Sequence, residues 1–175
     1  AATRRNLELD QNLIGGTENT LASVLDHTAT PMGGRLLRRW LHRPLRDLAT
    51  IKQRQFCVQS LIDDYRYEAL TPLLKKVGDV ERILARIALR SARPRDLERL
   101  SRALGALPLI QSELSEIDAP LLQSIRSSIS EFPQMHELLT RAVMENPPVI
   151  IRDGGVIAQG YDDELDELRA LSENA

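Results

Sequence analysis

The sequence is poor in aromatic residues and in cysteine, and each scarcity narrows the range of folds. Aromatic residues make up only 3% of the 175 residues, so the core must be built from Leu, Ile, Val and Ala. Such a core favours helices packed on helices over a β-sandwich or a barrel. Cys57 is the single cysteine, which excludes a disulfide framework and makes a reducing compartment the expected environment.

Signals for a membrane and for secretion are missing as well. No apolar run reaches the roughly 18 residues that a membrane-spanning helix needs. The first residues, AATRRNLEL, lack the apolar centre of a signal peptide. We therefore expect a cytoplasmic protein without a membrane partner. Because the chain has no initiating Met and ends within an expected helix, both ends are interpreted as fragment boundaries.

Residues that could carry catalysis or bind a metal are scattered along the chain. The histidines show no zinc-ligand spacing, and none of the glycine pairs fits a phosphate-binding loop. The acidic residues near the C-terminus lack the loop glycine of an EF-hand and fit a helix N-terminus instead. We expect no catalytic, cofactor-binding or metal-binding residues. The side chains of the types that bind zinc are His27, His42, His136 and Cys57.

Charge is nearly balanced over the whole chain but unevenly distributed along it. The net charge of −2 predicts no strong global attraction to nucleic acid. Residues 35–54 are basic with Asp47 as their only acid, and residues 82–102 carry seven arginines against two acids. Residues 153–173 are acidic. This pattern indicates docking between segments, or surfaces that meet other parts of a larger protein.

The densest basic run, residues 30–47, reads TPMGGRLLRRWLHRPLRD. Its start predicts a helix over about 31–42, with Thr30 as N-cap and a proline at the first helical position. We expect Trp40 to be the buried structural hub of the core, so that Trp40→Ala would cost about 3–5 kcal/mol. The candidates for non-specific phosphate contacts are the arginines of the opposite face, Arg35, Arg38 and Arg39.

Apolar spacing along the rest of the chain predicts an all-α fold with an irregular multi-helix core. Two small β features are also expected, a short strand around Leu7 and Leu9 and a β-hairpin over 149–158. The final helix, 162–175, has a narrow apolar stripe, which we expect to be exposed or paired with another molecule. The other expected helices cover about 48–62, 65–76, 80–90, 94–107, 108–114, 118–132 and 133–145.

Three long stretches resemble the core domain of the bacterial MutS family of DNA mismatch-repair proteins. They read TLASVLDHTATPMGGRLLRRWLHRPLRD, VGDVERILARIALRSARPRDLERL and PPVIIRDGGVIAQGYDDELDELRAL, in the order of the family. The resemblance implies a helical core domain over residues 1–118. It also implies that residues 119–175 begin a lever arm, including the hairpin 149–158 and the partial lever helix 162–175.

The resemblance also implies what the parent protein does. Such a parent is a DNA-dependent ATPase and a homodimer that binds mismatched double-stranded DNA and a MutL-type partner. The ATP and Mg²⁺ sites, the clamp and the mismatch-reading domain lie outside the present chain. The fragment would couple these parts structurally, without catalysis of its own. The alternatives from other classes are a non-specific nucleic-acid-binding helical module and a small metal-dependent enzyme.

Overall fold

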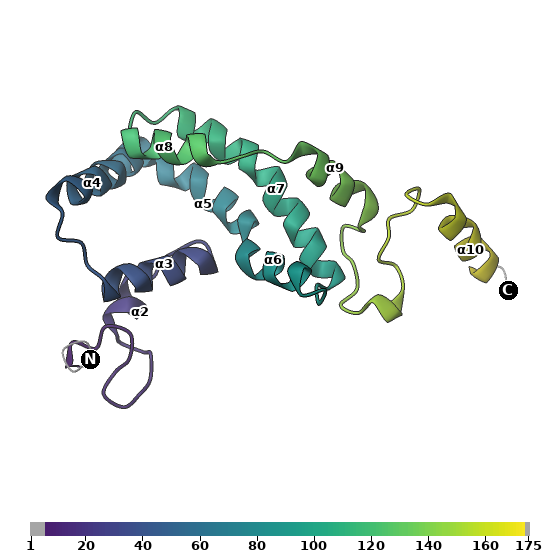
Figure 1. Ribbon diagram of the computed structural model, residues 1–175, viewed down its shortest axis with the longest axis horizontal. Coiled ribbons are helices and arrows are strands. Elements are labelled where there is room, and N and C mark those ends of the chain that lie inside the picture. The colour runs from purple at the N-terminus through teal and green to yellow at the C-terminus, as the bar shows by residue number, and fades with distance from the viewer. Residues whose placement is uncertain (1–5, 174–175) are drawn as a thin grey trace. The chain divides into compact units, whose positions relative to one another are not determined.

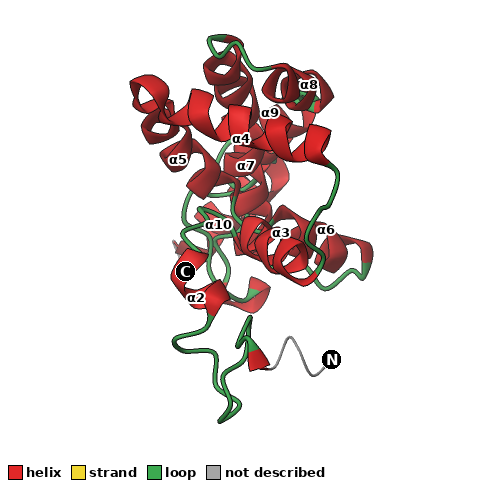
Figure 2. Ribbon diagram, turned by 90° about the vertical axis from the view of Figure 1, so that its left-hand side faces the viewer, coloured by secondary structure: helices red, strands yellow, loops and turns green. Residues whose placement is uncertain are grey.

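Helices dominate the computed structural model, which describes residues 6–173 (Figure 1 and Figure 2). The predicted all-α class is confirmed. The helices are α2 (Leu21–Leu25), α3 (Pro31–His42), α4 (Leu48–Ile62), α5 (Arg66–Val77), α6 (Val80–Ala88), α7 (Pro94–Ser115), α8 (Pro120–Ser128), α9 (Pro133–Ala142) and α10 (Asp163–Glu173). Two 3-10 turns accompany them, η1 (Asp63–Tyr65) and η2 (Ile151–Asp153).

Side-chain caps set the starts of α3 and α4, and the cap at Thr30 is the one that the sequence predicts. The Thr30 hydroxyl accepts a hydrogen bond of 3.0 Å from the Gly33 N–H, with Pro31 at the first helical position. The Asp47 carboxylate accepts one of 2.8 Å from the Thr50 N–H. Each cap satisfies an N–H group that has no partner within its own helix.

The predicted strand around Leu7 and Leu9 is wrong. These residues lie in turns, and their segment satisfies its backbone in another way. The carbonyl of Glu8 accepts from the Leu21 N–H at 3.1 Å, and that of Leu9 accepts from the Ala22 N–H at 2.8 Å. The segment therefore caps the first turn of α2 instead of pairing as a strand.

The predicted hairpin over 149–158 is also wrong. Residues 150–154 close into the turn η2, in which the N–H of Asp153 donates to the carbonyl of Ile150 at 3.2 Å. The segment after the two glycines instead lies against the end of α9. There, Val143 and Ile157 form an isolated antiparallel bridge, with the Met144 N–H donating to the Val156 carbonyl at 3.0 Å.

Helix α7 is longer than predicted, because we expected a break at Gly105 and Pro108. One helix instead runs from Pro94 to Ser115, with Pro108 inside it. A proline removes one helical hydrogen bond, and burial of the side chains around it outweighs that loss here. Buried residues flank the proline on both sides, at Ala106 and Ile110. Helix α8, by contrast, ends at Ser128, four residues before the predicted end.

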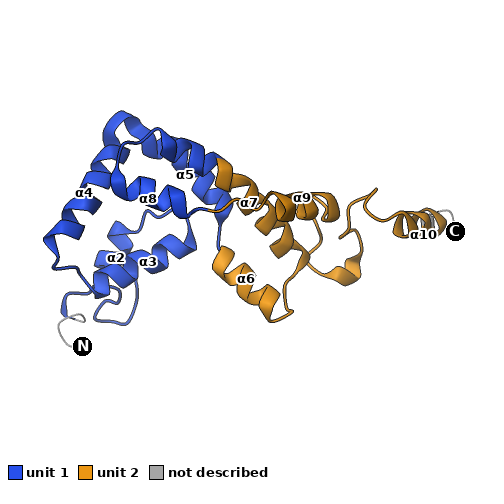
Figure 3. Cartoon of the chain, turned by 45° about the horizontal axis from the view of Figure 1, so that its top comes forward, with its two compact units in different colours: residues 1–79, 109–129 blue, residues 80–108, 130–175 orange. Residues whose placement is uncertain are grey.

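The chain divides into two compact units (Figure 3). Unit 1 comprises residues 1–79 and 109–129, and unit 2 comprises residues 80–108 and 130–175. In unit 1, α4 packs against α5 and α8, and α2 packs against α3. Cys57 of α4 is buried there and behaves as a small apolar side chain.

Unit 2 is organised around one apolar cluster. Ile83 of α6, Leu100 of α7 and Leu139 of α9 meet in it, together with Val143. The cluster fixes the two arginine-rich helices, α6 and α7, against each other within the unit. Partly buried residues pack around it, namely Val80, Leu97, Leu104 and Ala142.

Within residues 6–173, no helix is both long enough and apolar enough to cross a membrane.

Candidate functional site

The arginines of α3, proposed from the sequence as phosphate contacts, differ in what they bind. Arg35 donates two hydrogen bonds to the Asp79 carboxylate, at 2.9 and 2.7 Å. Arg38 forms an ion pair of 3.2 Å with Asp26. Arg39 is exposed, and its side chain makes no hydrogen bond or ion pair with any other residue of the described range. The fold thus brings acids to two of the three.

The Asp26 carboxylate that faces Arg38 is held in its charged form. Hydrogen bonds from the Thr28 hydroxyl and the Thr28 backbone N–H lower the pKa of this carboxyl, and the positive charge of Arg38 lowers it further. The ion pair therefore persists at neutral pH, and it neutralises much of the charge of Arg38.

Trp40 is not the buried anchor that the sequence predicted. Its side chain is 42% exposed, and the Arg54 guanidinium lies 3.8 Å from the centre of its ring. The buried residue of α3 is Gly34, where an added Cβ would lie 3.1 Å from an Asp26 carboxylate oxygen. Six residues turn a helix by about 600°, so Trp40 lies on a different side from Gly34. Close packing at the glycine leaves the indole at the edge.

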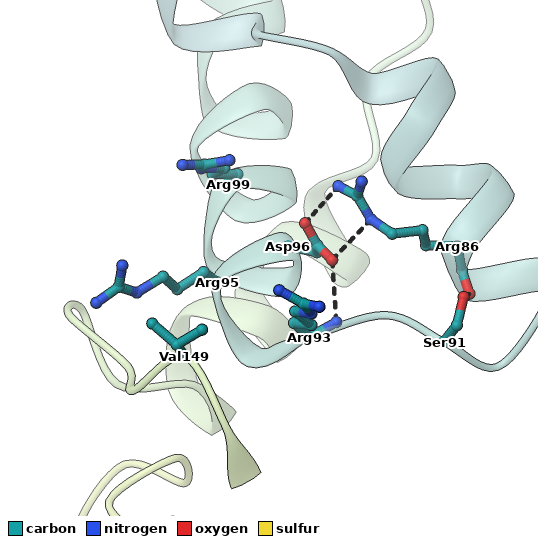
Figure 4. Close-up of a pocket in the computed structure, with 7 residues that line it drawn as sticks. All are labelled: Arg86, Ser91, Arg93, Arg95, Asp96, Arg99 and Val149. Carbon is teal, nitrogen blue, oxygen red and sulfur yellow. Dashed lines mark hydrogen bonds and ion pairs between the residues drawn. The ribbon is translucent and has the colours of Figure 1, made fainter.

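The second basic segment surrounds a cavity of about 560 Å³ in unit 2 (Figure 4). It lies where α6, the start of α7 and the chain near residue 149 come together. The lining includes four guanidinium groups and one carboxylate. The lining residues are Arg86, Ser91, Arg93, Arg95, Asp96, Arg99 and Val149.

Asp96 organises this cavity. Its carboxylate accepts hydrogen bonds from Arg86 Nε at 2.9 Å and from Arg86 Nη2 at 2.5 Å. It also accepts one of 2.9 Å from the Arg93 N–H, at the position just before α7 begins. Such a bond from the third helical residue back to the cap is one half of a capping box. One side chain thereby joins α6 to the start of α7.

Two opposed effects act on the pKa of Asp96. Burial raises it, whereas the hydrogen bonds from the Arg93 N–H and the Arg86 guanidinium lower it, as do the charges of Arg86 and Arg99. The lowering effects prevail, so the pKa lies below its ordinary value and the carboxylate is charged at neutral pH. Its charge is committed to Arg86, with which it forms a two-point contact.

Arg95 and Arg99 extend from α7 on the side away from Asp96 (Figure 4). Arg95 Nε donates to the Pro147 carbonyl at 3.2 Å. The Arg99 side chain makes no hydrogen bond or ion pair within the described part of the chain. In the sequence, the basic row 82–102 supports only the alternative of a non-specific nucleic-acid-binding module. Their spacing of four residues, which places them on one helix face, is the signal that could have identified the pair.

The histidines do not assemble into a metal site. His42 Nε2 lies 2.9 Å from an Asp10 carboxylate oxygen, and His136 Nδ1 lies 3.4 Å from the Ser101 hydroxyl. Among residues 6–173, no group of three or more His, Cys, Asp or Glu side chains is arranged to hold a metal ion.

The acidic residues at the start of the C-terminal helix α10 interact with groups of the same helix. The Asp162 carboxylate caps the helix by accepting from the Leu165 N–H at 2.9 Å, as the sequence indicates. Asp166 pairs with Arg169 at 3.1 Å. The apolar stripe is exposed at Leu168 and Leu171, so its predicted exposure is confirmed.

A comparison with known protein families matches residues 2–175 to MutS domain III. The match covers nearly the whole chain and includes all three stretches on which the resemblance rests.

Proposed function

The chain belongs to the MutS domain III family, a non-catalytic core domain of mismatch-repair proteins, and we propose that it couples the moving parts of its parent protein. In this proposal the parent's ATPase domain lies on one side of the coupling and its DNA clamp and mismatch-reading domain on the other. The chain itself is not an enzyme. Its contribution is to transmit a change of position.

The observation that carries the proposal is helix α7. Its first part, up to Pro108, belongs to unit 2, and its last part, from Leu109, belongs to unit 1. A helix is the stiffest connection that a chain can make between two compact units. Pro108 sits at the boundary and leaves one helical carbonyl without its usual N–H partner, which makes this point the natural place for bending.

Exposed apolar side chains support the same proposal. Phe56 in unit 1 and Leu89 and Leu171 in unit 2 are all exposed. Groups of this kind are suited to contacts with other domains.

We propose residues 1–118 as the core segment and 119–175 as the start of the lever. We propose further that the parent is a homodimer that binds ATP, mismatched DNA and a MutL-type partner in the cytoplasm.

The test is Pro108→Ala in the full-length parent. Replacing the proline restores a helical hydrogen bond and stiffens α7 at the boundary. We expect the rate of ATP-triggered release from mismatched duplex DNA to change, measured by stopped-flow fluorescence. ATP hydrolysis in the absence of DNA, and DNA affinity in the absence of ATP, should stay at their wild-type values.

Pro72→Ala is the matched control, because Pro72 is also a proline inside a helix but α5 lies wholly within unit 1. Both variants gain a helical hydrogen bond, and only one alters the helix shared by the units. Equal release rates for Pro108→Ala, Pro72→Ala and the wild type would contradict coupling through α7.

A second candidate function is non-specific binding of nucleic acid through the arginine-rich faces. The exposure of Arg39, which has no acidic partner in the described range, favours it. The net charge of −2 argues against broad electrostatic attraction. Fluorescence anisotropy of the 175-residue chain with mismatched duplex at low salt decides the matter. Tight binding with a steep salt dependence supports this function, and weak or absent binding supports the coupling role.

A further inference from the structure

We propose that the arginine-lined cavity of unit 2 binds a phosphate group. The inference goes beyond the coupling role and does not depend on it, because it concerns a local site within one unit. It also differs from general basic attraction, since it assigns the binding to one cavity and to particular side chains. Those side chains are Arg93, Arg95 and Arg99.

The cavity carries an excess of positive charge that the fold leaves uncompensated. Asp96 is the only acid among the lining residues, and its carboxylate is engaged by Arg86 and by the Arg93 backbone N–H. The guanidinium of Arg99 has no hydrogen-bonding partner within residues 6–173. That of Arg95 uses one N–H on the Pro147 carbonyl, which leaves its other donors for a ligand.

The placement of Arg95 and Arg99 opposes the stability of the helix that carries them. Like charges four residues apart on a helix repel, by about 0.2–0.5 kcal/mol. Arg95 also lies in the first turn of α7, where the helix dipole disfavours cations. The apolar cluster of unit 2 does not require either charge. An anion between the two guanidinium groups would reverse the repulsion and interact favourably with the dipole.

The several arginines of the lining favour a phosphate group over a single carboxylate. Guanidinium groups bind phosphate oxygens at two points each, and a phosphate group offers several oxygens to several arginines at once. The cavity volume of about 560 Å³ lies within the range of small-ligand sites, roughly 300–1,000 Å³. The shared chemistry is therefore a phosphate group, carried either by a free phosphate compound or by the backbone of DNA.

The first experiment uses pyrophosphate as the probe and Arg99→Gln as the variant. Arg99 was chosen because its side chain makes no contact that the fold needs, so the variant should fold as the wild type does. We expect pyrophosphate to raise the melting temperature of the wild-type chain above that in sodium chloride of equal ionic strength. Arg99→Gln should weaken pyrophosphate binding at least about tenfold, the size expected for one charge-assisted hydrogen bond. Arg99→Lys should keep part of it.

The matched control is Arg39→Gln, which removes the same charge from an exposed helical arginine of unit 1. The Arg39 side chain, like that of Arg99, has no partner among residues 6–173. It should leave pyrophosphate binding unchanged. Circular dichroism of both variants checks that each is folded.

The second experiment replaces pyrophosphate with a short DNA duplex and measures anisotropy against salt. If the phosphate comes from DNA, Arg99→Gln lowers the salt slope by about 0.9, the change for one lost phosphate contact, and Arg39→Gln does not. If it comes from a free compound, only pyrophosphate binding responds to Arg99→Gln. Equal effects of the two variants on both probes, or no binding of either probe to the wild type, would overturn the proposal. Failure of the coupling role would appear instead in Pro108→Ala, which leaves this cavity intact.

Discussion

The two arginine-rich segments of this chain look alike in sequence and differ in the structure. In α3, the fold brings Asp79 to Arg35 and Asp26 to Arg38, so most of the basic face is neutralised. Around the start of α7, the fold supplies one buried carboxylate for four guanidinium groups. The first segment is thus largely structural, and the second retains charge for a ligand.

A basic run can therefore serve as an anion-binding site only where the fold does not pair its arginines with acidic side chains. Both runs read as amphipathic helices with solvated arginines, and net charge cannot separate them. Long-range ion pairs distinguish the two runs, as between Arg35 and Asp79, which are 44 residues apart in the chain. Five measurements would break or sharpen this contrast.

The largest effect is expected from Asp96→Ala. The substitution leaves Arg86 without its buried partner and removes the hydrogen bond to the Arg93 N–H. The Asp96 side chain is only 7% exposed, so we expect a loss of about 2–4 kcal/mol in the free energy of unfolding, measured by urea denaturation. A loss below about 1 kcal/mol would show that the pair does not join α6 to α7.

The same carboxylate predicts a dependence on pH. Because the folded pKa of Asp96 lies below its unfolded value, the group stabilises the fold above about pH 4, and the contribution disappears as the pH falls through the folded pKa. The difference in stability between the wild type and Asp96→Ala should therefore shrink in acid. A difference that stays constant from neutral pH to strongly acidic pH would contradict this assignment.

Asp79→Ala should cost less, about 1 kcal/mol, although it also breaks a two-point contact with an arginine. The Asp79 and Arg35 side chains are 18% and 36% exposed, so water replaces part of what is lost. Fluorescence of Trp40, the only tryptophan, reports unfolding of unit 1 in this variant. A cost equal to that of Asp96→Ala would remove the distinction between the two segments.

Local rules were enough to predict much of the fold. Caps, prolines and apolar spacing gave the bounds of α3 and α4, because Thr30, Pro31 and Asp47 act on N–H groups within one helical turn. The β features were mispredicted for the opposite reason. The carbonyls of Glu8 and Leu9 accept hydrogen bonds from N–H groups of α2. These bonds depend on how the two segments pack, and the residues next to Glu8 and Leu9 in the sequence do not indicate it.

The candidate site was less predictable than the fold. The sequence named Arg35, Arg38 and Arg39, and nothing near them reveals that Asp79 would reach Arg35. The i,i+4 spacing of Arg95 and Arg99 was visible, but the cavity beside them depends on the chain near Val149, which meets α7 only in three dimensions. Charge patterns locate candidates, and tertiary pairing decides among them.

Trp40→Ala tests the corrected position of the tryptophan. With the indole 42% exposed, no large cavity forms, and the loss is the contact with the Arg54 guanidinium and part of the apolar burial. We expect a cost of about 1 kcal/mol, well below the 3–5 kcal/mol of a buried tryptophan. Because the variant has no tryptophan, circular dichroism must follow its unfolding. A cost of about 3 kcal/mol or more would restore Trp40 as the anchor of the α3 segment.

The smallest effects should differ in sign between the two segments. Arg99→Ala removes a repulsion from Arg95 near the start of α7 and also an attraction to the Asp96 carboxylate, which is the smallest of the effects on the pKa of that group. We therefore expect a net stabilisation of at most about 0.2–0.5 kcal/mol without phosphate present. Arg39→Ala also relieves like charges four residues away, yet Arg39 lies in the last turn of α3, where the helix dipole favours a cation. A change near zero or slightly destabilising is expected there. Both differences should fade at about 1 M salt, where the Debye length is near 3 Å. Destabilisation by Arg99→Ala at low salt would mean that the fold needs this charge, and the contrast between a paired segment and a segment reserved for a ligand would fail.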